Sequence, residues 1–119
     1  MPDILVSDNL YDIISSIELI ENRFKDIEKP DDFVLSENGI VILDSICMRL
    51  QIIGELAKKI QKIDPGIFER NKEIEWQNIM KLRDIISHHY ENVDHEIIYD
   101  ICSNHLPRLK KAVLDICKT

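Results

Sequence analysis

Apolar residues recur every three or four positions along most of the chain, which is the spacing of an amphipathic α-helix. The first stripe predicts a helix over residues 7–28, with Ser7 as its N-cap. The second predicts a helix of about 25 residues that begins after Ser36, a suitable N-cap. We expect the inward-facing positions of these two helices to be Leu10, Ile13, Ile14, Ile17, Ile20, Phe24, Ile27, Ile40, Leu43, Ile46, Cys47, Leu50, Ile53, Ala57 and Ile60.

The second half of the chain opens with a breaker, Asp64-Pro65-Gly66, which predicts a loop over residues 65–73 with at most a short helical turn. A third helix is expected from Glu75 to His89. Its apolar stripe consists of Trp76, Ile79, Leu82 and Ile86.

A fourth helix is expected to follow Asp94, which can cap its N-terminus. Pro107 predicts a kink or a restart, because proline has no amide hydrogen for a helix interior. The inward positions of this last part are Ile97, Ile98, Ile101, Cys102, Leu109, Val113 and Ile116. Since the sequence lacks strand-like alternation, these patterns predict an all-α fold, an antiparallel four- to five-helix bundle.

Composition sets the size and class of the protein. A chain of 119 residues that is 45% hydrophobic suits one domain spanning residues 1–119. The net charge of −7 argues against non-specific coating of nucleic acid but leaves a local basic pocket open. Cys47, Cys102 and Cys117 form no CxxC pair, so we expect reduced thiols. Without a basic leader or a long apolar segment, a cytoplasmic protein is expected.

The string RDIISHHY, residues 83–90, concentrates chemistry-bearing side chains. On a regular helix Arg83 and Tyr90 point almost the same way, and Asp84 and His88 share another direction. Arg83 and His88 diverge by roughly 140°. For Arg83 and His88 to bind one phosphate together, either the helix end bends or a second chain completes the site.

Ordinary surface chemistry is the alternative for this string. An arginine near a helix end often pairs with a glutamate, a histidine complements the helix dipole, and a tyrosine closes the core edge. Glu55 could pair with the motif arginine, pair with another chain or be solvated, and Gly54 is expected to permit close helix packing. Several basic residues could either guide RNA or be plain solvated positions: Lys58, Lys59, Lys62, Arg108, Lys110 and Lys111. The histidine spacing predicts no metal site.

Arg83-x4-His88-x-Tyr90 resembles the RxxxxHxY motif of HepT-like proteins, the toxin branch of the HEPN superfamily of small helical domains. The segments LQIIGELAKKI, IEWQNIMKLRD and VDHEIIYDICSNHLPRL are similar to that family in order and spacing, so the resemblance covers roughly residues 8–112. Asp84 stands where the family often has asparagine, and His89 where it commonly has glycine. The second departure leaves open which histidine transfers protons.

The resemblance implies a metal-independent endoribonuclease toxin that uses no cofactor. It implies acid/base work by His88 with His89 in support, phosphate stabilisation by Arg83, and orientation of His88 by Asp84. It also implies a homodimer, and a partner, an MntA-type nucleotidyltransferase antitoxin, that transfers AMP to Tyr90. The alternatives are a non-catalytic helical binding module for a nucleotidyltransferase and a substrate-positioning domain.

Overall fold

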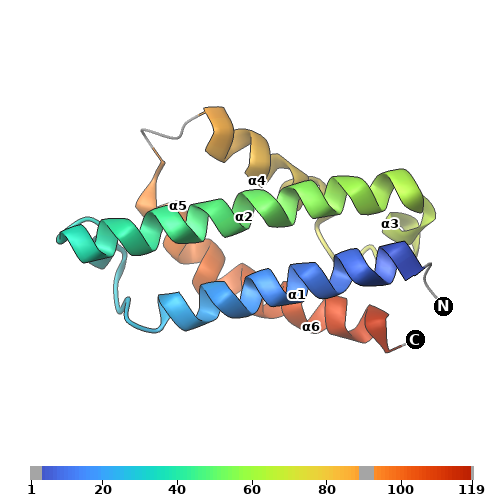
Figure 1. Cartoon of the computed structure of the whole chain (residues 1–119), viewed down its shortest axis with the longest axis horizontal. Coiled ribbons are helices and arrows are strands. Elements are labelled where there is room, and N and C mark those ends of the chain that lie inside the picture. The colour runs from blue at the N-terminus through green and yellow to red at the C-terminus, as the bar shows by residue number, and fades with distance from the viewer. Residues whose placement is uncertain (1–3, 89–92, 119) are drawn as a thin grey trace.

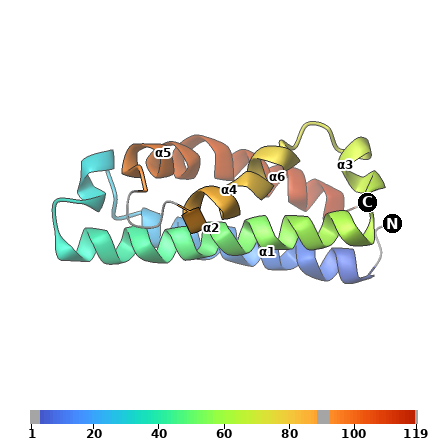
Figure 2. The ribbon, with the colours of Figure 1, turned by 90° about the horizontal axis from the view of Figure 1, so that it is seen from above.

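The computed structural model describes residues 4–88 and 93–118, and within these ranges every regular element is helical, as predicted. The two longest helices, α1 (Ile4–Phe24) and α2 (Glu37–Ile63), run antiparallel and pack side by side (Figure 1). Seen from above, α5 (His95–Asp100) and α6 (Leu106–Cys117) form a layer behind this pair (Figure 2). No helix in the described ranges is long and apolar enough to span a membrane.

Helix α1 is shifted toward the N-terminus relative to the prediction of residues 7–28. It begins at Ile4, so Ser7 lies inside the helix and the predicted N-cap is wrong. The reason is Val6, which is fully buried and extends the apolar stripe by one turn.

The C-terminal end of α1 comes at Phe24, four residues before the predicted end. The Asp32 carboxylate accepts hydrogen bonds from the backbone N–H groups of Glu28 and Lys29, at 2.9 and 3.2 Å. Because those amides would otherwise bond back along α1, the carboxylate ends the helix. A short 3₁₀ helix, η1 (Pro30–Phe33), follows.

Helix α2 begins as predicted, since the Ser36 hydroxyl accepts a hydrogen bond from the Gly39 N–H at 3.0 Å. The inward position of the first turn is Gly39, because a Cβ there would collide with the Asp32 carbonyl oxygen of η1. Ile40, one residue on, is 46% exposed. Its predicted place in the core is therefore wrong.

The second half contains the predicted elements and one that was not predicted. After the short α3 (Gly66–Arg70), α4 runs from Trp76 to His88, and the Asp94 carboxylate caps α5 through the Glu96 N–H at 2.9 Å. A π-helical turn, η3 (Ile101–His105), then precedes α6. The widened turn accommodates the missing amide hydrogen of Pro107, so the predicted restart is confirmed.

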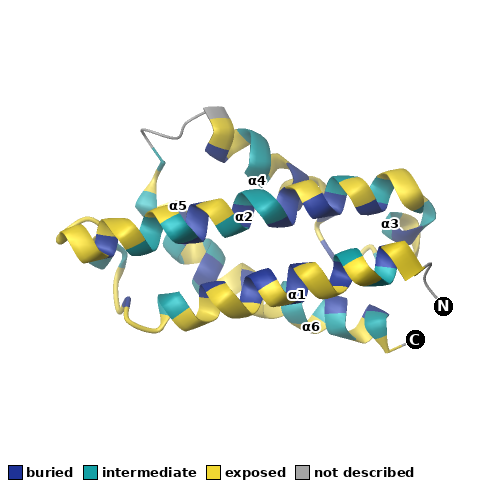
Figure 3. Cartoon of the chain, viewed as in Figure 1, coloured by how far each residue is buried: buried dark blue, intermediate teal, exposed yellow. Residues whose placement is uncertain are grey.

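Most of the predicted inward positions are buried or half-buried in one continuous core (Figure 3). Ile97 is the second error: it is 57% exposed, because its neighbour Ile98 faces the core. Phe33, from η1, is fully buried and was not predicted. Its ring contacts Phe24, whose ring in turn contacts Tyr99 of α5. These aromatic side chains close one end of the bundle.

Candidate active site at the α2–α4 seam

Helix α4 lies closely against α2 where α2 carries Gly54. A Cβ on Gly54 would sit 3.0 Å from the Cβ of Arg83 and 3.0 Å from the carbonyl oxygen of Ile79. Only a glycine leaves room for this approach without a shift of α4. The predicted role of Gly54 in helix packing is confirmed, and the approach fixes the backbone of Arg83 against α2.

Charged side chains line this contact, which we call the α2–α4 seam (Gln51, Gly54, Glu55 and Lys58 of α2; Arg83, Asp84 and Ser87 of α4). Arg83 Nε donates to Glu55 Oε1 at 3.3 Å, and its Nη1 donates to Asp84 Oδ1 at 3.5 Å. Lys58 Nζ lies 3.6 Å from the same Asp84 oxygen. Of the alternatives for Glu55, pairing with the motif arginine is confirmed.

The seam leaves Arg83 accessible. Its side chain is 41% exposed, and Glu55 and Asp84 are 47% and 50% exposed. Two cations and two carboxylates balance within the seam, so the fixed charge of Arg83 is compensated by groups of its own chain. An incoming phosphate can reach the guanidinium but must share it with these carboxylates.

The rest of the predicted site is placed only in part. His88 is the last residue of α4, and its side chain lies outside the described part of the structure, as do His89 and Tyr90. Asp84 was predicted to orient His88, and its described contacts go to Arg83 and Lys58. The roles of His88, His89 and Tyr90, and the orientation of His88 by Asp84, stay predictions.

Two seam residues, Gln51 and Ser87, were not predicted, and Lys58 was considered only as an RNA guide. Lys58 holds Asp84, and Gln51 Nε2 donates to Ser87 Oγ at 3.1 Å, which extends the seam toward the end of α4. A signal was present, because Gln51, Glu55 and Lys58 recur at helical spacing beside Gly54 on α2. These three polar residues mark the side of α2 that contacts the polar residues of α4.

Other reactive groups in the described ranges lie elsewhere. Burial raises the pKa of the free thiols of Cys47 and Cys102 to about 11 and about 12, so both are neutral core residues at pH 7. Within residues 4–88 and 93–118 no three histidine, cysteine, aspartate or glutamate side chains are grouped as a metal site.

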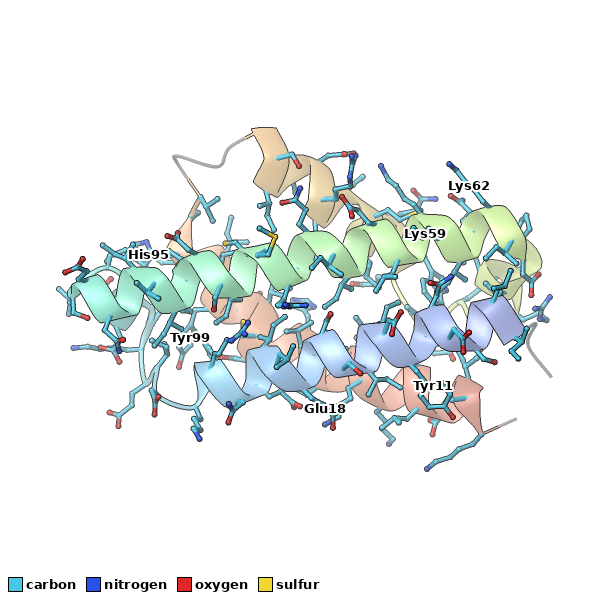
Figure 4. The ribbon with its side chains drawn as sticks, viewed as in Figure 1. Tyr11, Glu18, Lys59, Lys62, His95 and Tyr99 are labelled. Carbon is cyan, nitrogen blue, oxygen red and sulfur yellow. The ribbon has the colours of Figure 1, made fainter. Side chains whose placement is uncertain are left out.

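The basic residues considered as RNA guides differ in their surroundings. Lys110 of α6 is tied to Glu21 and Glu18 of α1 at 2.9 and 3.7 Å, and the hydrogen bond to Glu21 raises the pKa of Lys110. Lys59 and Lys62 are exposed on the C-terminal half of α2 (Figure 4). Lys110 therefore joins α6 to α1, whereas the two α2 lysines face solvent.

Helix α4 packs Arg83 against Gly54 of α2, the longest helix, and ends at His88. This arrangement and the sequence Arg83-x4-His88-x-Tyr90 define a small helical domain with an RxxxxHxY-type motif. The family model described as Ribonuclease HepT-like matches residues 13–116. The chain belongs to this family.

Curated relatives agree with this assignment. "Probable ribonuclease HepT" of Thermococcus cleftensis is 32% identical over 87% of this chain and 87% of its own length. "Putative RNase TTE0752" of Caldanaerobacter subterraneus subsp. tengcongensis is 30% identical over 90% of this chain and 89% of its own. "Gamma-glutamylcyclotransferase and putative RNase MJ0434" of Methanocaldococcus jannaschii is 34% identical over 90% of this chain, which spans 45% of that longer protein. No solved structure matches the chain.

Proposed function

We propose that the chain is an endoribonuclease in which residues 1–119 act as one HepT-like domain, working in the cytoplasm where RNA is available. Membership of the Ribonuclease HepT-like family supports this, as do the ribonuclease names of its relatives. The observation that carries the proposal is the accessible guanidinium of Arg83, held by Glu55 and Asp84 on the helix that ends at His88.

The proposed reaction needs two proton transfers and a fixed positive charge. The RNA 2′-oxygen bonds to the adjacent phosphorus while the bond from phosphorus to the 5′-oxygen of the next nucleotide breaks. One proton leaves the 2′-hydroxyl and one reaches the 5′-oxygen, and histidine at position 88, or at 89, suits these transfers near neutral pH. Arg83 offsets the charge that grows on the phosphorane oxygens. Asp84 orients His88, and no step uses a metal.

A homodimer completes this site. Helix α4 runs without a break from Trp76 to His88, so positions 83 and 88 lie about 140° apart around the axis of a regular helix. The bend considered from the sequence is therefore not the route that we propose. Two-fold symmetry instead brings the arginine of one copy toward the histidine of the other, because an isologous contact repeats each group on both sides.

Regulation by a nucleotidyltransferase belongs to the same proposal, with this chain as the toxin of a toxin–antitoxin pair. An MntA-type partner transfers AMP from ATP to the Tyr90 phenol, with pyrophosphate as the leaving group. The attached phosphate then puts negative charge where the RNA phosphate must bind. After incubation with the partner and ATP, mass spectrometry should locate AMP on Tyr90. AMP only on another residue, or none, would remove this role.

The ribonuclease proposal is tested with purified protein, total cellular RNA and an excess of chelator. Arg83→Ala and His88→Ala should each slow fragmentation by at least about 100-fold, the effect of losing a charge-stabilising or proton-transfer group. The matched control is Arg70→Ala, since Arg70 is another exposed arginine paired with a carboxylate, Asp64. It should cut like the parent. Parental rates in the Arg83 or His88 variant contradict the assignment.

A non-catalytic binding module is the second candidate. It is favoured by the ion pairs of Arg83, because Glu55 and Asp84 already give the guanidinium partners within its own chain. In that case Arg83 only ties α4 to α2. The Arg83→Ala protein would then lose thermal stability, and neither it nor the parent would fragment RNA, which separates the two candidates.

A further inference from the structure

A groove opens on the other side of α4, between α4 and the η3–α6 segment. Its volume is about 370 Å³, which falls within the range of small-ligand sites in proteins. The floor is apolar, built from Leu82 and Ile85 of α4 and from Ile101, Leu106 and Leu109 of η3 and α6. We call it the α4–α6 groove. Figure 2 shows α4 set between α2 and the layer that contains α6.

A chain of hydrogen bonds fixes a guanidinium at the edge of this groove. Arg108 Nε donates to the Asn104 carbonyl oxygen at 3.1 Å, and Nη2 donates to His105 Nδ1 at 3.2 Å. Because Nδ1 accepts, the imidazole hydrogen is on Nε2, which donates to Asp100 Oδ2 at 3.2 Å. Asn104 Nδ2 donates to the other Asp100 oxygen at 2.7 Å. Arg108 is thus oriented before any ligand arrives.

The π-helical turn η3 makes this arrangement possible. It spans Ile101–His105, and π-turns inside helices occur frequently at functional sites. It places Asp100, Asn104 and His105 where they brace one another ahead of Pro107. The hydrogen bond from Asn104 lowers the pKa of Asp100, so this carboxylate stays charged and keeps His105 in place.

The charges around the groove are not uniform. Lys81 of α4 and Arg108 of α6 both line it, as does Asn78, whose Nδ2 donates to Glu75 Oε2 at 3.3 Å and whose amide oxygen can accept. Glu73 and Glu75 also line it, and they precede α4 in the chain. Asp100 is already engaged by Asn104 and His105. The groove therefore joins an apolar floor to two cations, with the two glutamates just before the first turn of α4.

We propose that the α4–α6 groove holds one nucleotide of the RNA substrate, with its base on the apolar floor and its phosphate at Arg108 and Lys81. The inference rests on the proposed ribonuclease function. A base has apolar faces and a polar edge, which match the floor and Asn78, and a guanidinium suits a phosphate better than a point charge does.

The groove and the seam lie on opposite sides of one helix. Groove residues Lys81 and Ile85 are turned away from Arg83 by about 160° on a regular helix. A helix with its side chains is about 10 Å across, a distance that a short stretch of single-stranded RNA can span. The groove would hold a nucleotide beside the one that is cut, so it would affect RNA affinity more than the rate of the chemical step.

Binding of AMP, used as the simplest nucleotide probe, tests the groove by itself. In heteronuclear NMR titrations, AMP should shift the backbone amides of Lys81, Ile85 and Ile101. Arg108→Ala should weaken binding roughly tenfold, as expected for losing a charge-assisted contact to phosphate, whereas Arg70→Ala should not. Thermal melts establish that the Arg108 variant is folded. Absence of shifts in the groove, or an unchanged Kd in the folded variant, overturns the proposal.

Binding of single-stranded RNA then tests the link to cleavage. In the Arg83→Ala background, where RNA stays intact, adding Arg108→Ala should raise the Kd for RNA roughly tenfold. In the parent, Arg108→Ala should raise KM and leave kcat within about twofold. AMP binding without any change in RNA affinity also overturns the proposal, because the groove would then serve free nucleotides. If Arg83→Ala still cuts RNA, the ribonuclease assignment fails, while the AMP result on the groove stands.

Discussion

The α1–α2 pair and helix α4 differ in how their contacting surfaces are composed and how exposed they are. The inward face of α1 is apolar and largely inaccessible, and Leu10, Ile13, Ile17 and Ile20 are all 0% exposed. Helix α4 contacts α2 on one side and borders the α4–α6 groove on the other. Its contact with α2 includes half-exposed ion pairs, which contribute only about 0–1 kcal/mol each in solvent. The difference indicates that the α1–α2 contact provides stability, while α4 carries the exposed charged groups of the proposed site.

This division suits a site that must admit a polymer. A helix embedded on all sides could not expose a guanidinium to RNA, and a helix with no tight contact could not hold it still. At Gly54 the structure meets both demands, because α4 is in backbone contact with α2 there while Arg83 stays 41% exposed. Substitutions in α1 should therefore change mainly the free energy of unfolding, whereas substitutions at the seam should change mainly the rate of RNA cleavage.

The largest effect on stability is expected in the α1–α2 pair. Ile17→Ala should lower the free energy of unfolding by about 3 kcal/mol, since it removes a fully buried side chain and leaves a cavity. Urea denaturation at fixed protein concentration measures this. Below the melting temperature, RNA cleavage should stay close to parental, because the seam is unchanged.

The matched control lies on the same helix. Leu19→Ala removes a side chain that is 39% exposed and should cost much less, within about 1 kcal/mol. Equal losses for Ile17→Ala and Leu19→Ala would contradict the burial of this face. A large loss of cleavage in folded Ile17→Ala would contradict the separation between the stabilising pair and the seam.

A smaller effect, on both stability and RNA cleavage, is expected at Gly54, where α2 contacts α4. Alanine is a better helix former than glycine by about 1 kcal/mol. At Gly54, however, the added Cβ meets the Ile79 carbonyl oxygen and the Arg83 Cβ at 3.0 Å. Overpacking of this kind costs about 1–3 kcal/mol. Gly54→Ala should therefore be neutral to destabilising, and it should reduce RNA cleavage roughly tenfold, because α4 moves and carries Arg83 with it.

Gly66→Ala is the control for this substitution. The atom nearest its added Cβ is Arg70 Nη1, at 2.7 Å, the far end of a flexible side chain that can move away. Cleavage should be unchanged in that variant. If Gly54→Ala cut RNA at the parental rate and were more stable than the parent, close packing at the seam would not be what positions Arg83.

How much the sequence predicted also differs between the two regions. The caps at Ser36 and Asp94 and the stripes of α1 and α2 follow from neighbours within a few residues, and they were predicted correctly apart from the ends of α1 and the place of Ile40. Ile40 was misplaced because its orientation depends on how η1 packs against Gly39. Local periodicity carries no information about such a contact.

The seam was only partly predictable for the same physical reason. Arg83, Asp84 and the proximity allowed by Gly54 could be named from the sequence, but the pairing of Arg83 with Glu55 joins residues 28 apart and depends on the register of α4 on α2. The π-turn η3 and the α4–α6 groove were missed. The π-turn lies just before Pro107, and the groove is lined by residues of several helices, α4, η3 and α6 among them, so neither follows from the periodicity of a single helix.

The smallest effect is expected from the charge of Glu55. Glu55→Gln keeps an oxygen that can accept from Arg83 Nε but removes a negative charge beside the proposed phosphate position. Stability should change by less than about 1 kcal/mol, as for exposed pairs. RNA should bind about threefold more tightly at low salt, and the gain should shrink as ionic strength rises, because screening weakens charge effects between exposed groups.

Glu55→Ala separates charge from position. It removes the same charge and also the acceptor that holds the guanidinium, so kcat should fall severalfold while RNA affinity still improves. Steady-state kinetics of the two variants at several salt concentrations give both quantities. If Gln and Ala substitutions have the same effect on kcat, Glu55 does not position Arg83, and its contact with Asp84 and the close packing at Gly54 must hold the arginine. In that outcome the ion pair between Arg83 and Glu55 is incidental to the proposed chemistry, and the geometry of α4 depends on its backbone contact with α2 and on Asp84.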